Sequence, residues 1–191
     1  MDRFYTVFHD HFPFLTEDDI YQLKDHAGIL HLQKKESWHH GQYQYKVGFI
    51  AEGALRAFFI DQAGKEITTI IKTDGQTMVL PGAAQRGYGK TYFSQAILPS
   101  TLIEIPLPSL LMLCQQNSRI FQFFMLNIVD HLNALMERVE HLISLKPEER
   151  VAYLTQHKQD FVERIPQKYL ADFIGITPVS FSRLLKKLSE D

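Results

Sequence analysis

The sequence predicts an α+β protein built from an all-β body, one long helix and a C-terminal pair of short helices. Three observations predict it. Hydrophobic residues alternate with a period of two from Gly28 to about Pro106. A helical period without Gly or Pro then runs from Asn117 to Leu145. Finally, the segment from Ile165 to the C-terminus reads as two short helices joined at Gly175.

Composition limits the class of protein before any motif is considered. The 191 residues carry a net charge of -2, so a polyanion such as DNA must bind a local patch rather than the whole surface. The single cysteine, Cys114, excludes a disulfide framework and a four-thiolate metal centre supplied by one chain, and it suits a reducing cytosol. The N-terminal MDRFYTVFHDHF has no apolar core of a signal peptide. FQFFMLNIV is too short to span a bilayer. We therefore expect a cytoplasmic protein without a membrane partner.

The first zone opens with a helix and continues with short strands. Thr16 is a suitable N-cap because acids at 17–19 follow it. Alternation then predicts strands near 30–33, 47–52, 55–60 and 67–71, with a hairpin turn at 61–64. Gly41, Gly53, Gly64 and Gly75 recur every 11 or 12 residues. This spacing is typical of a sandwich, a jelly roll or a barrel.

The long helix carries a strict apolar repeat. Six residues follow one another at steps of 3, 4, 3, 4 and 3: Met125, Ile128, Leu132, Leu135, Val139 and Leu142. One interpretation is an amphipathic helix packed on its own β body. The other is a homodimer seam, which the strict alternation favours, because helices on globular cores usually show a wider and less regular stripe.

The last zone, from Lys146, ends in a predicted helix-turn-helix. Gly175 lies where the chain must turn sharply, and Thr177 followed by Pro178 is a strong helix start. Four basic residues and one acid lie between Ile165 and Lys187. An ordinary helical hairpin with a solvated basic face is the alternative to a DNA-reading element. The candidate DNA-binding residues are Gln167, Lys168, Thr177, Val179, Ser180, Ser182, Arg183, Lys186 and Lys187.

These motifs resemble the Crp/Fnr family, the cyclic-AMP receptor protein and its relatives. The resemblance covers essentially the whole chain and is carried by VGFIAEGALRAFFIDQAGKE (Val47 to Glu66), by EER at 148–150 and by LADFIGITPVSFSRLLKKL near the C-terminus. It implies a β-roll (a jelly roll of the cyclic-nucleotide-binding type) over residues 1–116, a dimerisation helix over 117–145 and a helix-turn-helix over 146–191. It also implies a homodimeric transcriptional regulator that binds double-stranded DNA, a small-molecule effector and contact with RNA polymerase. No catalytic site, metal or cofactor is expected.

The sequence departs from the family pattern in its effector segment. Members that bind cyclic AMP hold the ribose with a Gly-Glu pair and the cyclic phosphate with an Arg. The equivalent stretch, Val79 to Ser100, contains no carboxylate. The ribose hydroxyl therefore loses a charge-assisted hydrogen bond of about 1.5–3 kcal/mol. The chain thus resembles a compact subgroup without an intact phosphate cassette. We expect an effector other than cyclic AMP, or none, with Arg86 and Lys90 as the candidate anion contacts.

The helix-turn-helix departs from the pattern as well. Val179 occupies a position that is commonly Glu in the family, and valine can contact a thymine methyl but cannot accept a hydrogen bond from cytosine. Arg183 matches the family's arginine and is suited to guanine or to a phosphate. Because the sequence stops at Asp191, we expect no full wing after the second helix.

A cupin-like metal enzyme or small-molecule binder with a C-terminal helical cap is the competing hypothesis. Only His9-x-His11 and His39-His40 cluster among the nine histidines. Adjacent histidines in a strand point to opposite faces, so the second pair is poorly placed to share a metal. Cys114 lies among leucines and methionine and is expected to be a buried small hydrophobe. We therefore favour the DNA-binding regulator.

Overall fold

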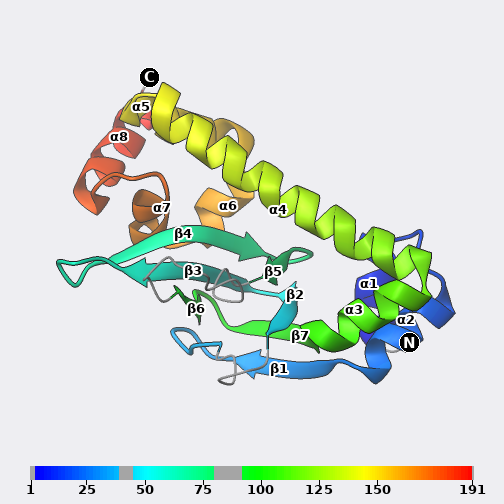
Figure 1. Ribbon diagram of the computed structural model, residues 1–191. Coiled ribbons are helices and arrows are strands. Elements are labelled where there is room, and N and C mark those ends of the chain that lie inside the picture. The colour runs from blue at the N-terminus through cyan, green and yellow to red at the C-terminus, as the bar shows by residue number, and fades with distance from the viewer. Residues whose placement is uncertain (1–2, 39–44, 80–91, 191) are drawn as a thin grey trace.

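The computed structural model describes residues 3–38, 45–79 and 92–190, and it confirms the α+β organisation. Two helices precede the β body, and the remaining helices follow it (Figure 1). The strands are β1 (Gly28–Leu32), β2 (Lys46–Glu52), β3 (Ala54–Ile60), β4 (Glu66–Thr73), β5 (Thr77–Val79), β6 (Tyr92–Ala96) and β7 (Ser100–Pro106). The helices are α1 (Arg3–His11), α2 (Glu17–Asp25), α3 (Leu107–Gln116), α4 (Ser118–Ser144), α5 (Pro147–His157), α6 (Gln159–Arg164), α7 (Gln167–Phe173) and α8 (Pro178–Glu190).

The strands form two antiparallel sheets. One sheet has the order β1-β7-β2-β5, and the other has the order β4-β3-β6. The predicted turn between β3 and β4 is present, and the amide of Asp61 donates to the carbonyl of Lys65 across it. Gly64 has a φ of 79°, which glycine adopts without strain. Strand order and helix placement match the β-roll that the resemblance implies.

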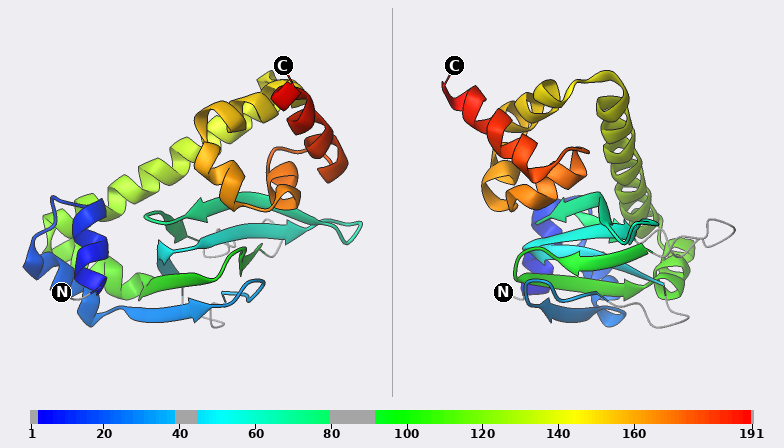
Figure 2. Two further views of the ribbon diagram at one scale, coloured as in Figure 1. Left: turned by 180° about the vertical axis from the view of Figure 1, so that it is seen from behind. Right: turned by 90° about the vertical axis from the view of Figure 1, so that its left-hand side faces the viewer.

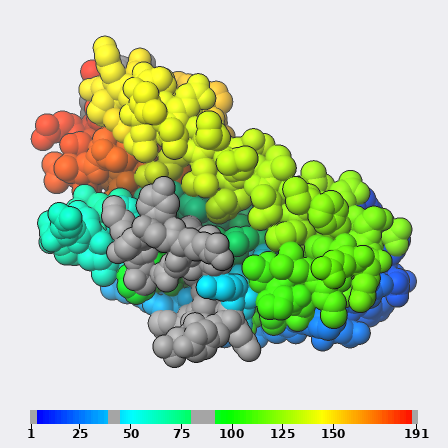
Figure 3. Space-filling model, viewed as in Figure 1, coloured from blue at the N-terminus to red at the C-terminus, as the bar shows by residue number. Residues whose placement is uncertain are grey.

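The helices divide between the two ends of the β body. α1, α2 and α3 lie together with the start of α4 at one end (Figures 1 and 2). α4 then crosses the molecule, and α5 to α8 lie over the sheet that contains β3 and β4. In the space-filling view α4 forms a surface ridge between these two ends (Figure 3). The predicted long helix is confirmed, with Asn117 as its N-cap and Leu145 as its C-cap.

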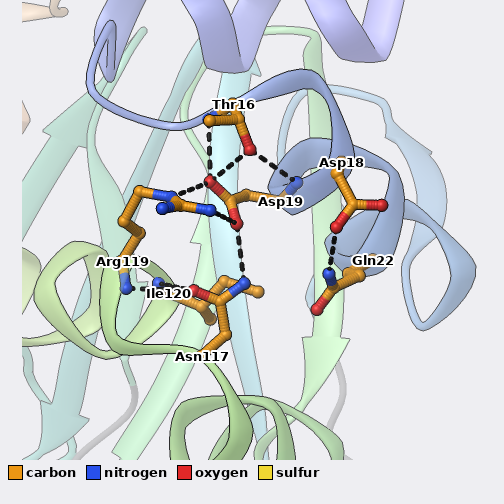
Figure 4. A network of polar contacts seen from close by, with 7 residues as sticks. All are labelled: Thr16, Asp18, Asp19, Gln22, Asn117, Arg119 and Ile120. Carbon is orange, nitrogen blue, oxygen red and sulfur yellow. Dashed lines mark hydrogen bonds and ion pairs between the residues drawn. The ribbon is translucent and has the colours of Figure 1, made fainter.

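A buried carboxylate joins the N-terminal helices to α4 (Figure 4). Asp19 is fully buried and accepts hydrogen bonds from Thr16, from Asn117 at 2.6 Å and from Arg119 at 2.5 Å. Its bond with Thr16 completes the capping box that begins α2. Burial alone would raise the pKa of Asp19, but the bonds from Arg119, Thr16 and Asn117 outweigh burial and hold this pKa well below its usual value.

The hydrophobic core has three parts. The first packs α1, α2 and α3 against β2 and β7, and Phe8 lies in it. The second fills the space between the two sheets around Leu55 and Met78. The third joins Ala54 and Ile71 of the second sheet to the C-terminal helices. The C-terminal segment therefore shares a core with the β body in this conformation.

Candidate nucleic-acid interface

The C-terminal helices form the predicted helix-turn-helix. α7 ends at Phe173, and the turn passes through Gly175, whose φ of 72° lies in the left-handed region. The hydroxyl of Thr177 accepts the amide of Ser180 at 3.1 Å and caps the start of α8. The hydroxyls of Thr177 and Ser180 also lie 2.9 Å apart. Both hydroxyls therefore stabilise the first turn of the second helix.

The second helix, α8, has one buried side and one exposed side. Phe181 is fully buried, and Leu184 and Leu185 are half-buried. Leu188, near the C-terminal end of α8, is exposed. The exposed side carries five of the predicted DNA-binding residues: Val179, Ser182, Arg183, Lys186 and Lys187. The exposed side of α8 is thus short, mostly polar and positively charged.

The remaining predicted contacts lie at the starts of the two helices. Gln167 and Lys168 are exposed in the first turn of α7, and the ammonium of Lys168 lies 4.4 Å from the ring centre of Tyr169. Thr177 is exposed and Ser180 is half-buried at the start of α8. The structure therefore brings all nine predicted residues into the helix-turn-helix, with five of them on the exposed side of α8.

Sequence reasoning missed how the helix-turn-helix is attached to the β body. Among the described strands, β4 lies at one edge of its sheet, so one side of its backbone has no neighbouring strand within the described residues. The Thr68 amide on this edge donates to the carboxylate of Asp172 in α7 at 2.5 Å. Such an edge is usually protected from pairing with other chains, and α7 covers it here. Asp172, the one acid of the basic segment, is thereby occupied in a structural contact.

Two arginines strengthen the same junction. Arg138 of α4 donates to the carbonyls of Phe173 at 2.9 Å and of Thr68 at 3.2 Å. Arg150 of α5 donates to the carbonyl of Ile174 at 2.5 Å. Burial lowers the pKa of Arg138, and the charge of Asp172 opposes that shift. These bonds satisfy carbonyls at the end of α7, and they fix the helix-turn-helix relative to both α4 and β4.

A third cation packs between the sheet and α7. Arg56 of β3 is almost fully buried, with its guanidinium 4.7 Å from the ring centre of Tyr169. The same group pairs with Glu66 and donates to Gln95 at 2.8 Å. Although Arg56 belongs to the stretch from Val47 to Glu66 that carries the family resemblance, the structure gives it a role in packing.

The apolar seam predicted on α4 is divided between two faces. Leu135 packs against the core between the sheets, Leu142 lies beside Gly175 of the turn, and Ile128 is half-buried. The other three predicted residues, Met125, Leu132 and Val139, are exposed. Half of the predicted seam therefore faces the protein's own body. The predicted heptad repeat therefore mixes residues of two stripes, one that faces the body and one that is exposed.

A complete apolar stripe remains exposed on α4. It consists of Phe121, Met125, Val129, Leu132, Met136, Val139 and Ile143, which we call the outer stripe. Its members follow at steps of 4, 4, 3, 4, 3 and 4. Ile143 is 82% exposed, and Leu132 is 55% exposed. Phe121 is 51% exposed and belongs to this stripe, whereas its neighbour Phe123 is buried. An apolar stripe of this length at heptad spacing is typical of a helix that pairs with another helix.

The remaining predictions concern the anion contacts, a metal site, Cys114 and membrane spans. Arg86, Lys90 and the His39-His40 pair lie outside the described residues. Within the described part of the chain, no group of three or more His, Cys, Asp or Glu side chains could hold a metal ion. Cys114 is half-buried, and burial raises the pKa of its thiol. No helix in the described ranges combines the length and the hydrophobicity needed to cross a membrane.

Comparisons with solved structures identify the fold. FixK2 from Bradyrhizobium japonicum aligns over 86% of this chain and 85% of its own, with a TM-score of 0.73 and 16% identity. A regulator of the Crp/Fnr family from Eubacterium rectale aligns over 94% and 88%, with a TM-score of 0.70 and 17% identity. The c-di-GMP-responsive regulator CLP from Xanthomonas campestris aligns over 90% and 91%, with a TM-score of 0.70 and 16% identity. No family model and no curated sequence matches the chain. The fold is that of Crp/Fnr transcriptional regulators, as the sequence resemblance predicted.

Proposed function

We propose that this protein is a homodimeric, sequence-specific DNA-binding transcriptional regulator without enzymatic activity. The observation that carries the proposal is the exposed side of α8, where Arg183, Lys186 and Lys187 project from a capped helix whose other side is buried. A helix presented in this way fits the major groove. The fold shared with Crp/Fnr regulators supports a DNA-binding role for the C-terminal helices over the role of a helical cap on a cupin-like protein.

The residues of α8 have distinct roles in the proposed complex. Arg183 donates two parallel hydrogen bonds to guanine or to a phosphate. Val179, 68% exposed in the first turn, contacts a thymine methyl. Ser182 makes no hydrogen bond within the described part of the chain, so its hydroxyl is available to DNA. Thr177 and Ser180 act indirectly because their hydroxyls cap the helix. Gln167 and Lys168, at the start of α7, contact the phosphate backbone.

The outer stripe of α4 is the proposed dimer interface. Its seven apolar residues have no other covering element among the described residues, and their spacing suits a left-handed pair of helices. Pairing along this stripe leaves the body-facing residues Leu135 and Leu142 in place. A two-fold dimer then presents two copies of α8, and these enter successive major grooves when they lie about 34–36 Å apart. The operator is therefore a near-palindrome.

Regulation follows from the docking of the helix-turn-helix on β4. The Asp172 and Arg138 contacts fix α8 relative to α4, and α4 sets the dimer axis. A signal that moves β4 or α4 changes the fraction of molecules in which both copies of α8 fit DNA at once. A small-molecule effector acting on the β-roll would work in this way, and contact with RNA polymerase would follow DNA binding.

Capture of genomic DNA by the purified full-length protein tests the proposal. Sheared DNA is bound, washed and sequenced, with wild type and Arg183→Ala compared at two salt concentrations. Wild type should enrich a small set of sites sharing a motif. Arg183→Ala should lose that enrichment while retaining its fold, as checked by circular dichroism. Equal recovery of all sequences by both proteins would contradict sequence-specific binding.

A further inference from the structure

A small cavity lies where the last turns of α4 pack against α5 and the end of α7. α4 and α5 meet at a sharp corner on the side of the molecule that carries the helix-turn-helix (Figures 1 and 2). The cavity has a volume of about 30 Å³. A single water needs roughly 10–15 Å³ of such space, so the cavity admits a small ion or about two waters but no larger metabolite. Its lining comes from these helices and their ends and not from a strand of the β-roll.

Arg150 of α5 brings an unsatisfied donor to the lining of this cavity. Its Nη1 donates to the carbonyl of Ile174 at 2.5 Å. Its Nε–H is buried and has no hydrogen-bond partner in the part of the chain that the structure describes. A charged donor that is shut away from water is costly unless an acceptor reaches it. The cavity beside Arg150 is the space in which such an acceptor fits.

The carboxylate that lines the cavity is already paired. Glu137 of α4 forms an ion pair with Lys158 at 2.6 Å and also accepts the hydroxyl of Tyr153. Burial alone would raise the pKa of Glu137, but the bonds from Lys158 and Tyr153 outweigh burial and hold this pKa below its usual value. Glu137 is therefore ionised, and its charge is matched by that of Lys158. The remaining charges of the lining belong to Arg138 and Arg150.

The two arginines leave the cavity positively charged. Neither Arg138 nor Arg150 has a carboxylate within ion-pair distance among the described residues. Their hydrogen bonds end on backbone carbonyls at the end of α7 and on β4. Asp172 acts on Arg138 only from further away, through its charge. Carbonyls accept hydrogen bonds but carry no net charge, so the positive charge of the pair is not neutralised in the cavity.

His141 of α4 supplies a second donor to the lining. Its ring packs edge-on against that of Tyr153, with the ring centres 4.2 Å apart. Neither of its ring nitrogens makes a hydrogen bond within the described ranges of the chain. A neutral imidazole carries one N–H and an imidazolium carries two, so the ring is a donor in both protonation states. The cavity thus combines unused donors with an excess of positive charge.

We infer that this cavity binds a small monovalent inorganic anion, of the size of chloride or nitrate, beside the guanidinium of Arg150. The anion accepts the buried Nε–H of Arg150 and offsets the charge that Arg138 and Arg150 share. The ring of His141 offers it a further donor. A water would satisfy the same donor but would leave the charge uncompensated. The small volume excludes phosphate esters and other organic anions.

The position of the cavity connects the anion to the DNA-binding helices. The lining comes from α4, which carries the outer stripe, and from α5 and the end of α7, which belong to the C-terminal helices. The complete site exists only while these three elements are packed together. A bound anion therefore favours the docked arrangement of the helix-turn-helix. This regulatory consequence rests on the proposed function, whereas anion binding itself does not.

Thermal unfolding in exchanged salts tests the inference. The full-length protein is kept at constant ionic strength while sodium glutamate, whose anion is too large for the cavity, is replaced stepwise by sodium chloride or by sodium nitrate. Arg150→Met removes the charge and the Nε–H donor. Lys146→Met is the matched control, because Lys146 is an exposed cation at the N-cap of the same helix and does not line the cavity. His141→Phe keeps an aromatic ring and removes its nitrogens.

Wild type and Lys146→Met should show a saturable rise in Tm as chloride or nitrate replaces glutamate. Arg150→Met should need at least tenfold more anion for half of this rise, and His141→Phe should need more than wild type. Wild-type crystals soaked in bromide should show anomalous density beside Nε of Arg150, a result that does not depend on the folding of any variant. A cavity without bromide would overturn the inference. So would a rise in Tm that is linear with both anions, or one that is the same in Arg150→Met and Lys146→Met. Such a failure leaves DNA capture unaffected, so the two proposals fail separately.

Discussion

Replacing Leu132 with aspartate tests the outer stripe of α4. Leu132 lies at the middle of the stripe and exposes 55% of its surface. Complete burial of a leucine contributes about 1.5–3 kcal/mol, so its exposed half contributes about 1 kcal/mol per protomer on pairing. Aspartates facing each other across a two-fold axis add desolvation and repulsion, for a total of about 4 kcal/mol or more per dimer. The dimer dissociation constant should therefore rise roughly 1,000-fold.

Sedimentation velocity over a range of protein concentrations measures this effect. Wild type should sediment as a dimer at micromolar concentration and Leu132→Asp as a monomer with an unchanged circular dichroism spectrum. Leu126→Asp is the matched control, because Leu126 is also exposed on α4 but lies about a third of a turn from Leu132 around the helix. If the Leu132→Asp variant sediments as a dimer, the outer stripe is not the dimer interface. An equal loss of dimer in Leu126→Asp would lead to the same conclusion.

Further predictions concern three single side chains. Asp19→Asn should lower the free energy of unfolding by about 2 kcal/mol in urea titrations, because Arg119 loses its anionic partner; an unchanged midpoint would contradict this role. Because the folded-state pKa of Asp19 is depressed, its contribution is present above about pH 4 and is lost as pH falls, so wild type should lose more stability than Asp19→Asn in acid unfolding. Arg183→Ala should weaken specific DNA binding by about 1–3 kcal/mol in fluorescence anisotropy if Arg183 reads a base; an equal loss on every sequence would mark it as a phosphate contact. Asp172→Asn should speed hydrogen exchange at the Thr68 amide by more than tenfold, and unchanged protection would argue against the docking contact.

Much of the fold could be predicted because strands, helix caps and turns depend on residues that are close together in the sequence. Alternation located β1 to β4, and Thr16, Gly64, Gly175 and Thr177 identified a cap or a turn from residue chemistry alone. These features depend on the conformational preferences of neighbouring residues, and the structure agrees with each of them.

The division of α4 into two faces could not be predicted in the same way. Periodicity shows that apolar residues share a side of a helix, but it does not show which neighbour covers that side. Leu135 and Val139 both fit the predicted seam, yet Leu135 packs in the protein's own core and Val139 is exposed. Choosing between them required the position of the β body, which is set by contacts far apart in sequence.

Contacts distant in sequence also explain what was missed around β4. In the sequence, Asp172 is only the single acid within a basic segment. Its structural role depends on the edge position of β4 and on the packing of α7 beside that strand. Neither strand order nor helix docking can be read from the spacing of residues within one segment.

Selection of DNA from a random library by the purified full-length protein is the decisive measurement of sequence-specific binding by a homodimer. A homodimer that presents two copies of α8 should enrich an inverted repeat whose half-site centres lie about 10–10.5 base pairs apart, with or without added cell extract. Failure to enrich any sequence under either condition, or enrichment of a single unrepeated half-site, would contradict the account.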